Sequence, residues 1–251
     1  MLKDKKLLND YVLDLLDSIE QNISAFSKGH KPESLHRLRV ALKKIKAIFS
    51  FTENISKEKI DISKLKKIFF EAGKIRELGI NINLLKGVPH PPERLITRLE
   101  KKENLLIQQF IKKSSKYIIL IKNFRKKICL PKKVDDKKTI IEFFKKEKRK
   151  ANKILKHIER EVMHDYRKKI KRLMYIYDTL PKGMKEKIKL NEVEIDKQQK
   201  ILGDWHDTYS AIHIFSHASN SKQKSEYILS LKVKEERLFN TFILSVLNKR
   251  L

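Results

Sequence analysis

Apolar residues recur at helical spacing through almost the whole chain, and few residues interrupt the pattern. The 251 residues include only 6 Gly and 6 Pro, whereas all-β folds need many turn residues. The sequence therefore predicts an all-α fold with long helices. Chain breakers divide it into eight expected helices, at approximately 4–28, 33–53, 58–86, 93–129, 137–157, 160–180, 184–218 and 222–250.

The sequence also repeats itself. Three polar residues of one segment return in the same order 128 positions later: His36, Arg39 and Lys43 become His164, Arg167 and Lys171. A second repeated segment follows, in which Gly73 and Arg76 correspond to Gly203 and His206 at a shift of 130 residues. Two copies of a four-helix unit explain both shifts. We expect one domain over 1–251, made of two antiparallel four-helix bundles related by a pseudo-two-fold repeat, 1–130 and 131–251.

The repeated helix has two different sides. At about 100° per residue, four basic side chains fall within about 80° of arc; we call this set the first stripe, and its members are His36, Arg39, Lys43 and Lys46. The apolar residues Leu38, Leu42, Ile45, Ile48 and Phe49 lie opposite. The second repeat keeps the pattern, except that Met174 replaces the fourth cation.

An ordinary solvated helix face mixes charges of both signs, because opposite charges one turn apart stabilise it. The first stripe contains no carboxylate. It extends for about 15 Å along the helix, which suits a chain of several phosphates better than one phosphate. An anion site is therefore favoured over a merely solvated face.

The composition agrees with this interpretation without establishing it. The net charge is +28, from 59 Lys and Arg against 31 Asp and Glu, although a Lys-rich composition alone raises net charge. The single cysteine, Cys129, cannot form an internal disulfide. No apolar run reaches the roughly 20 residues that a membrane span requires. We expect a soluble cytoplasmic protein with no membrane partner.

Each residue type in the repeat suggests a role. Arginine forks onto two phosphate oxygens, and lysine supplies a compact mobile charge. We expect neighbouring cations to lower the pKa of His36 and His164 in the empty site, and bound phosphate to raise it. Gly73 and Gly203 are interpreted as sites of close helix crossing rather than ligand contact, and Trp205 as a core residue.

These residues resemble the CHAD family, the conserved-histidine α-helical domain. The first family motif appears as His36, Arg39, Val40, Lys43, Lys44 and Lys46, followed by Gly73, Arg76 and Glu77. The second appears as His164, Arg167, Lys168, Lys171, Arg172 and Tyr175, followed by Gln199, Leu202, Gly203, His206 and Asp207. The four motifs occur in the family order and cover almost the whole chain.

The resemblance implies two facing four-helix bundles with a basic cavity between them that binds inorganic polyphosphate. The binding residues that it implies, together with the stripes, are His36, Arg39, Lys43, Lys44, Lys46, Arg76, His164, Arg167, Lys168, Lys171 and Arg172. The chain departs from the family pattern where Lys44 and Lys46 replace Arg, Glu77 replaces Asp and His206 replaces Asn. Lysine keeps the charge but loses the fork, so we expect the affinity for polyphosphate or the preferred chain length to differ from the family pattern.

Two other functions remain open. A nucleic-acid-binding protein also needs a basic surface, but base readers interleave aromatic or amide side chains, and the first stripe has none. The pairs His164–Asp165 and His206–Asp207 suggest a metal-dependent phosphohydrolase, although neighbouring residues on a helix diverge by about 100°. We therefore assign no catalytic residue, metal ligand or cofactor, and leave the oligomeric state open. Association with polyphosphate granules would follow from the binding.

Overall fold

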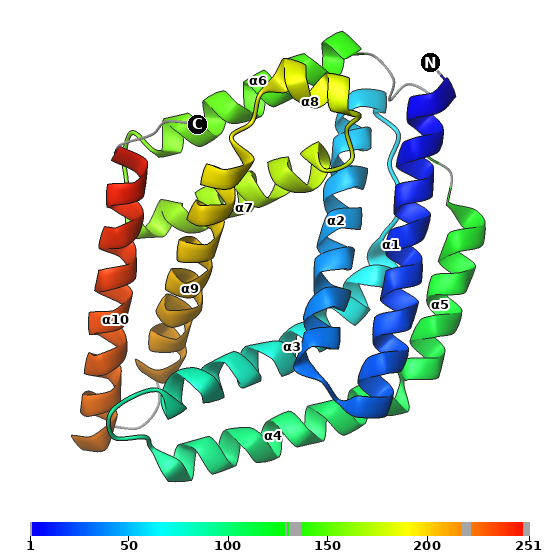
Figure 1. Cartoon of the computed structure of the whole chain (residues 1–251). Helices are drawn as coiled ribbons and strands as arrows, with labels where there is room; N and C mark the ends of the chain where they lie inside the picture. The colour runs from blue at the N-terminus through cyan, green and yellow to red at the C-terminus, as the bar shows by residue number, and fades with distance from the viewer. Residues whose placement is uncertain (1, 129, 131–136, 217–221, 248–251) are drawn as a thin grey trace. The chain divides into compact units, whose positions relative to one another are not determined.

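The computed structural model describes residues 2–128, 130, 137–216 and 222–247. These residues form ten α-helices and no strand (Figure 1). The helices are α1 (Leu2–Gly29), α2 (Pro32–Ser56), α3 (Ser63–Lys86), α4 (Glu93–Lys112), α5 (Ser114–Lys127), α6 (Lys137–Ile154), α7 (Arg160–Tyr177), α8 (Lys182–Ile188), α9 (Glu192–Ser216) and α10 (Lys222–Leu247). The predicted all-α fold is confirmed for this part of the chain.

The predicted number of eight helices is wrong, because two expected helices are each divided. The segment 93–129 breaks at Lys113, which precedes α5 without a side-chain cap. The segment 184–218 breaks after α8, where Lys189 adopts a positive φ of 52°. Neither break coincides with a glycine or proline, so the breaker residues did not reveal them.

The chain forms two compact units whose segments alternate along the sequence. Unit 1 comprises Met1–Leu78, Lys102–Glu142 and Tyr175–Lys187, and unit 2 comprises Gly79–Lys101, Phe143–Met174 and Ile188–Leu251. Helices α3, α4, α6, α7 and α8 contribute residues to both units. The division into bundles 1–130 and 131–251, and the cavity shared by them, stay predictions.

In unit 1, α2 packs against α1, which also packs against α5 (Figure 1). The apolar side predicted for the repeated helix is buried, from Leu38 to Phe49. Facing side chains of α1 are fully buried as well, and Phe26 meets the edge of Phe110 with ring centroids 5.6 Å apart. Burying this side fixes the rotation of α2 and so turns its basic residues away from this core.

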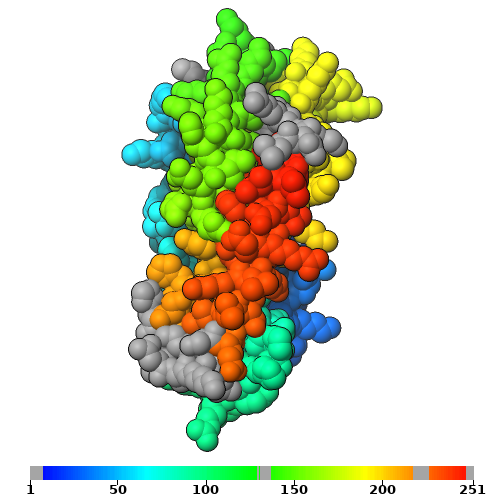
Figure 2. All heavy atoms as spheres, turned by 90° about the vertical axis from the view of Figure 1, so that its left-hand side faces the viewer, coloured from blue at the N-terminus to red at the C-terminus, as the bar shows by residue number. Residues whose placement is uncertain are grey.

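Unit 2 has its core between α7, α9 and α10. Trp205 is fully buried there with Tyr166, Ile170 and Phe242, so its predicted role as a core residue is confirmed. A second cluster gathers residues of α3, α4, α9 and α10 around Leu85. Figure 2 shows α10, in orange and red, at the surface of this unit, where Leu229, Val233 and Leu244 are exposed. The α10 helix therefore packs on α9 with one side and leaves another side in solvent.

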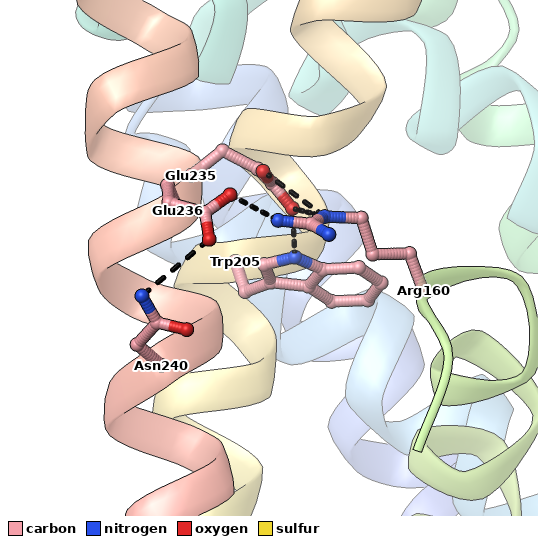
Figure 3. Close-up of polar contacts among 5 residues, drawn as sticks. All are labelled: Arg160, Trp205, Glu235, Glu236 and Asn240. Carbon is pink, nitrogen blue, oxygen red and sulfur yellow. Dashed lines mark hydrogen bonds and ion pairs between the residues drawn. The ribbon is translucent and has the colours of Figure 1, made fainter. Parts of the chain in front are cut away.

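A partly buried polar network ties the start of α7 to α9 and α10 (Figure 3). The indole nitrogen of Trp205 donates to Glu235 Oε1 over 2.5 Å, and Arg160 Nε donates to the same oxygen over 3.0 Å. Arg160 also pairs with the exposed Glu236, and its guanidinium lies 4.5 Å from the ring centroid of Phe239. Because His164 follows Arg160 by one turn, this network helps to position α7.

No helix among the described residues is long and apolar enough to cross a membrane.

Replacing Glu235 with alanine should lower the free energy of unfolding by about 1–3 kcal/mol, because the buried indole N–H of Trp205 loses its acceptor. The matched control is Glu236→Ala, which removes a carboxylate that is 57% exposed and should change stability by less than about 1 kcal/mol. Urea denaturation measures both. Equal losses would contradict a dominant role for the Trp205–Glu235 bond.

Candidate anion-binding sites

Within unit 1, the first stripe meets α3 at Phe69. Nη1 of Arg39 donates a hydrogen bond to the Phe69 carbonyl over 2.7 Å, and the guanidinium carbon lies 4.3 Å from the centroid of the Phe69 ring. The ammonium of Lys43 lies 5.9 Å from the same ring. One residue of α3 therefore holds two cations of α2 through its carbonyl and its aromatic face.

The absence of a side chain at Gly73 leaves space for the Arg39 guanidinium. A Cβ atom at position 73 would overlap Nη1 of Arg39 and lie 3.2 Å from its Cζ. The missing side chain thus makes room for an arginine, not for the backbone of a crossing helix as the sequence suggested. Phe69, Gly73 and Arg76 follow one another at intervals of one turn, so they share one face of α3.

Arg39 is a desolvated cation without a carboxylate hydrogen-bond partner. Burial lowers its pKa to about 10, the like charge of Arg76 adds to the effect, and Glu77 opposes it. Its Nε is buried and has no hydrogen-bond partner among the described residues. Arg39 stays charged at neutral pH, and burying a charge in this way is unfavourable until an anion compensates it.

Unit 2 repeats the arrangement with α7 and α9. A Cβ atom at Gly203 would lie 3.9 Å from Nη2 of Arg167, so this glycine also lies beneath the arginine. One turn earlier on α7, His164 stacks on His206 of α9, with ring centroids 4.6 Å apart and ring planes 20° apart. The contacts 164–206 and 167–203 follow the same antiparallel register as 39–73 and 43–69.

Polar atoms at this second site face no protein partner among the described residues. Nδ1 of His164 and Nε2 of Gln199 are both buried there without a hydrogen bond. Gln199 precedes Gly203 by one turn and corresponds to Phe69 in the first repeat. A buried polar atom without a partner is costly, so a ligand that supplies the missing hydrogen bonds is favoured.

The pKa of His164 is lowered to about 4. Burial is the largest cause, followed by His206, Lys168 and Arg167, whereas Asp165 acts in the opposite sense. The predicted direction is confirmed, but the predicted cause needs correction. Neighbouring cations rank below burial and below a second imidazole that the repeat did not identify as a partner.

Two of the residues implied by the family motif point away from the sites. Lys44 and Arg172 are equivalent in the repeat, and each lies about 80° around its helix from the site histidine. The Lys44 ammonium bonds the Tyr11 hydroxyl over 3.0 Å and Asp178 over 3.2 Å. Burial lowers its pKa, but these two partners outweigh it and raise the pKa overall. Arg172 lies 5.7 Å from the ring of Phe143. Both side chains contact neighbouring helices instead.

The remaining predicted residues divide between the sites and their surroundings. Arg76 acts electrostatically on Arg39, which places it at the first site. Lys168 is exposed and pairs with Asp165 over 3.2 Å. Lys46 is exposed, whereas its counterpart Met174 is buried in the core, which explains why the fourth cation is missing from the second repeat.

Sequence reasoning missed Phe69. Its signal is positional, because it precedes Gly73 by one turn as Gln199 precedes Gly203. The first site is therefore defined by Arg39, Lys43, Phe69, Gly73 and Arg76. The second site is defined by His164, Arg167, Gln199, Gly203 and His206, and the shared register brings Lys171 to the turn opposite Gln199.

The family model of the CHAD domain matches residues 10–216, so the chain belongs to the CHAD family. The crystal structure of the CHAD domain from the plant Ricinus communis is similar, with 13% identity, a TM-score of 0.69, and coverage of 98% of this chain and 92% of that one. PptA from Streptomyces chartreusis is similar at 10% identity, with a TM-score of 0.61 and coverage of 97% and 98%. No curated protein matches the chain. At these identities the two solved structures show the fold alone.

The substitutions Gly73→Ala and Gly203→Ala should change the free energy of unfolding by different amounts. Alanine in a helix interior is favoured over glycine by about 0.5–1 kcal/mol, so Gly203→Ala should stabilise the protein by this amount. At Gly73 the gain should be cancelled, because Arg39 must leave its carbonyl and lose a hydrogen bond of about 1 kcal/mol. Urea denaturation measures both variants. An equal gain at the two positions would show that Arg39 has no fixed place against α3.

Proposed function

We propose that this protein binds inorganic polyphosphate at the two repeated sites and does not catalyse a reaction. The observation that carries the proposal is the half-buried Arg39 guanidinium, which hydrogen-bonds a neutral carbonyl rather than a carboxylate. Lys43 and Arg76 lie beside it. An arginine in such surroundings is unfavourable in the empty protein and forms strong charge-assisted hydrogen bonds with an anion.

Several features favour a chain of phosphates over a single phosphate. The first stripe offers cations over about 15 Å, and the same arrangement occurs a second time. The second site adds His164 Nδ1 and Gln199 Nε2, which have no hydrogen-bond partner in the part of the chain that the structure describes. A linear polyanion satisfies many spaced cations at once, and such multiple contacts raise affinity without any single strong one.

A binding role without catalysis fits the chemistry of these side chains. Cations, imidazoles and one amide gather at the two sites, rather than a nucleophile beside its base. At the suggested His164–Asp165 pair, the carboxylate is exposed and pairs with Lys168, while the imidazole stacks on His206. Across the residues that the structure describes, no three His, Cys, Asp or Glu side chains lie together as a metal site.

Arg39→Ala and Arg167→Ala should each weaken polyphosphate binding at least about tenfold. Each removes a charge-assisted contact of about 1.5–3 kcal/mol, and about 1.4 kcal/mol corresponds to a factor of ten. Isothermal titration calorimetry with long-chain polyphosphate measures the affinity, and circular dichroism verifies that the variants remain helical.

The chain offers matched controls for both changes. Arg37 is an exposed arginine on the same helix as Arg39 and pairs with Glu33, and Arg149 is an exposed arginine of unit 2. Arg37→Ala and Arg149→Ala remove the same charge away from the sites and should change affinity less than about threefold. If all four variants lost affinity equally, diffuse net charge would be responsible for the binding.

One observation favours single-stranded nucleic acid as a second candidate ligand. Phe70 is 62% exposed and meets Phe69 edge-on, with ring centroids 5.9 Å apart. An exposed aromatic ring beside basic residues is the arrangement on which bases stack. The first stripe did not reveal this exposed ring, because the stripe belongs to α2 and Phe70 belongs to α3.

A competition between the two polyanions separates these functions. At equal phosphate concentration, long-chain polyphosphate should bind more tightly than single-stranded DNA, and Phe70→Ala should leave polyphosphate affinity unchanged. The affinity should also fall steeply with salt, by about 0.7–0.9 log units per log unit of salt for each neutralised phosphate, as for nucleic acids. Tighter binding of DNA, with a large loss in Phe70→Ala, would identify nucleic acid as the ligand instead.

A further inference from the structure

The two sites differ at one position that bears on proton binding. Facing α2, α3 carries Arg76, whereas α9 carries His206 at the equivalent position facing α7. Arginine stays charged at every relevant pH. The second site carries an imidazole, which stacks on His164, where the first site carries a guanidinium.

The geometry of the His164–His206 pair restricts where a proton can go. The rings stack at 4.6 Å, so two imidazolium charges would lie face to face. Nδ1 of His164 is buried and, among the described residues, no acceptor bonds it. A proton added there needs an acceptor from outside the protein. A phosphate oxygen is such an acceptor, and its charge also offsets the repulsion between the two rings.

The charged groups around His164 come from both helices of the site. On α7 these are Arg167 and Lys168, which disfavour a proton on His164, and Asp165, which favours one. On α9, His206 disfavours it, and Asp207 lies 3.5 Å from Nδ1 of His206. In the empty site burial and the cations prevail, and the pKa of His164 is about 4.

We propose that the stacked His164–His206 pair makes anion binding at the second site proton-linked, so that this site takes up a proton when it binds polyphosphate. The inference rests on the proposed function and concerns its regulation. His206 is then a positioning residue, since its ring stacks on the imidazole of His164.

The sign of the effect follows from linkage. The pKa of His164 is depressed in the free protein and rises when phosphate is bound, so the complex holds more protons than the free protein at intermediate pH. Affinity therefore increases as the pH falls through the pKa of the complex, and it levels off below about 4. Uptake of one full proton corresponds to a tenfold gain in affinity per pH unit, which is about the upper limit for one histidine.

The test is isothermal titration with long-chain polyphosphate at pH 8, 7 and 6, in two buffers of different ionisation enthalpy, which counts the protons taken up. Wild-type protein should bind more tightly at pH 6 and take up protons there. His206→Asn and His164→Asn should take up fewer protons at pH 6 than the wild-type protein, so their gain in affinity between pH 8 and pH 6 should be smaller. His157→Asn, which removes an exposed imidazole of the same unit, should behave as wild type.

A second measurement does not depend on any variant. Imidazole chemical shifts of wild-type protein, followed against pH, should show one ring titrating near pH 4 without polyphosphate and at a higher pH with it. Proton uptake that is unchanged in both histidine variants, or a ring pKa that polyphosphate does not move, would overturn the inference while leaving the proposed function intact. Absence of binding at every pH would instead overturn the proposed function and the inference with it.

Discussion

Both sites have an arginine side chain that lies over a helical glycine, and at the first site this placement requires the glycine. Arg39 hydrogen-bonds the Phe69 carbonyl and occupies the space that Gly73 leaves open. In unit 2, Arg167 lies over Gly203 in the same register. Because a guanidinium held by a carbonyl and an aromatic ring is desolvated but not neutralised, the fold maintains an unfavourable charge. The free-energy cost of this charge is explained if the charge serves to hold an anion. Strained backbone at functional sites is retained for the same kind of reason.

The arginine is surrounded by different side chains in the two sites. Phe69 supports the first site with a carbonyl and a ring, whereas Gln199 at the equivalent turn contributes an amide whose nitrogen is buried. Arg76 lies at the first site, whereas the second site has His206, which stacks on His164, at the equivalent position. The internal repeat therefore keeps the position of the arginine while its surroundings have diverged, so the two sites are chemically different environments.

Helical periodicity predicted most of the fold, because the apolar sides of the long helices are continuous and the buried set from Leu38 to Phe49 matches the expected one. The breaks at Lys113 and Lys189 escaped prediction, since lysine carries no turn preference. The signal at the second break is Asn191, whose Oδ1 accepts a hydrogen bond from the backbone N–H of Glu194 and caps α9. The repeat located His164, Arg167 and Gly203. It could not show that Phe69 supports Arg39, or that Lys44 and Arg172 turn toward Tyr11 and Phe143, because these contacts join segments that are distant in sequence.

The central claim is that Arg39 and Arg167 bind the polyanion directly, and nitrogen NMR of the arginine side chains tests it most directly. Titration with long-chain polyphosphate should shift the guanidinium signals of both residues strongly and in parallel with binding. The signals of the exposed Arg37 and Arg149 should move little, because the ligand does not contact them. Unchanged signals from Arg39 and Arg167, with large shifts at the exposed arginines, would contradict the account and assign the binding to the general positive charge of the surface.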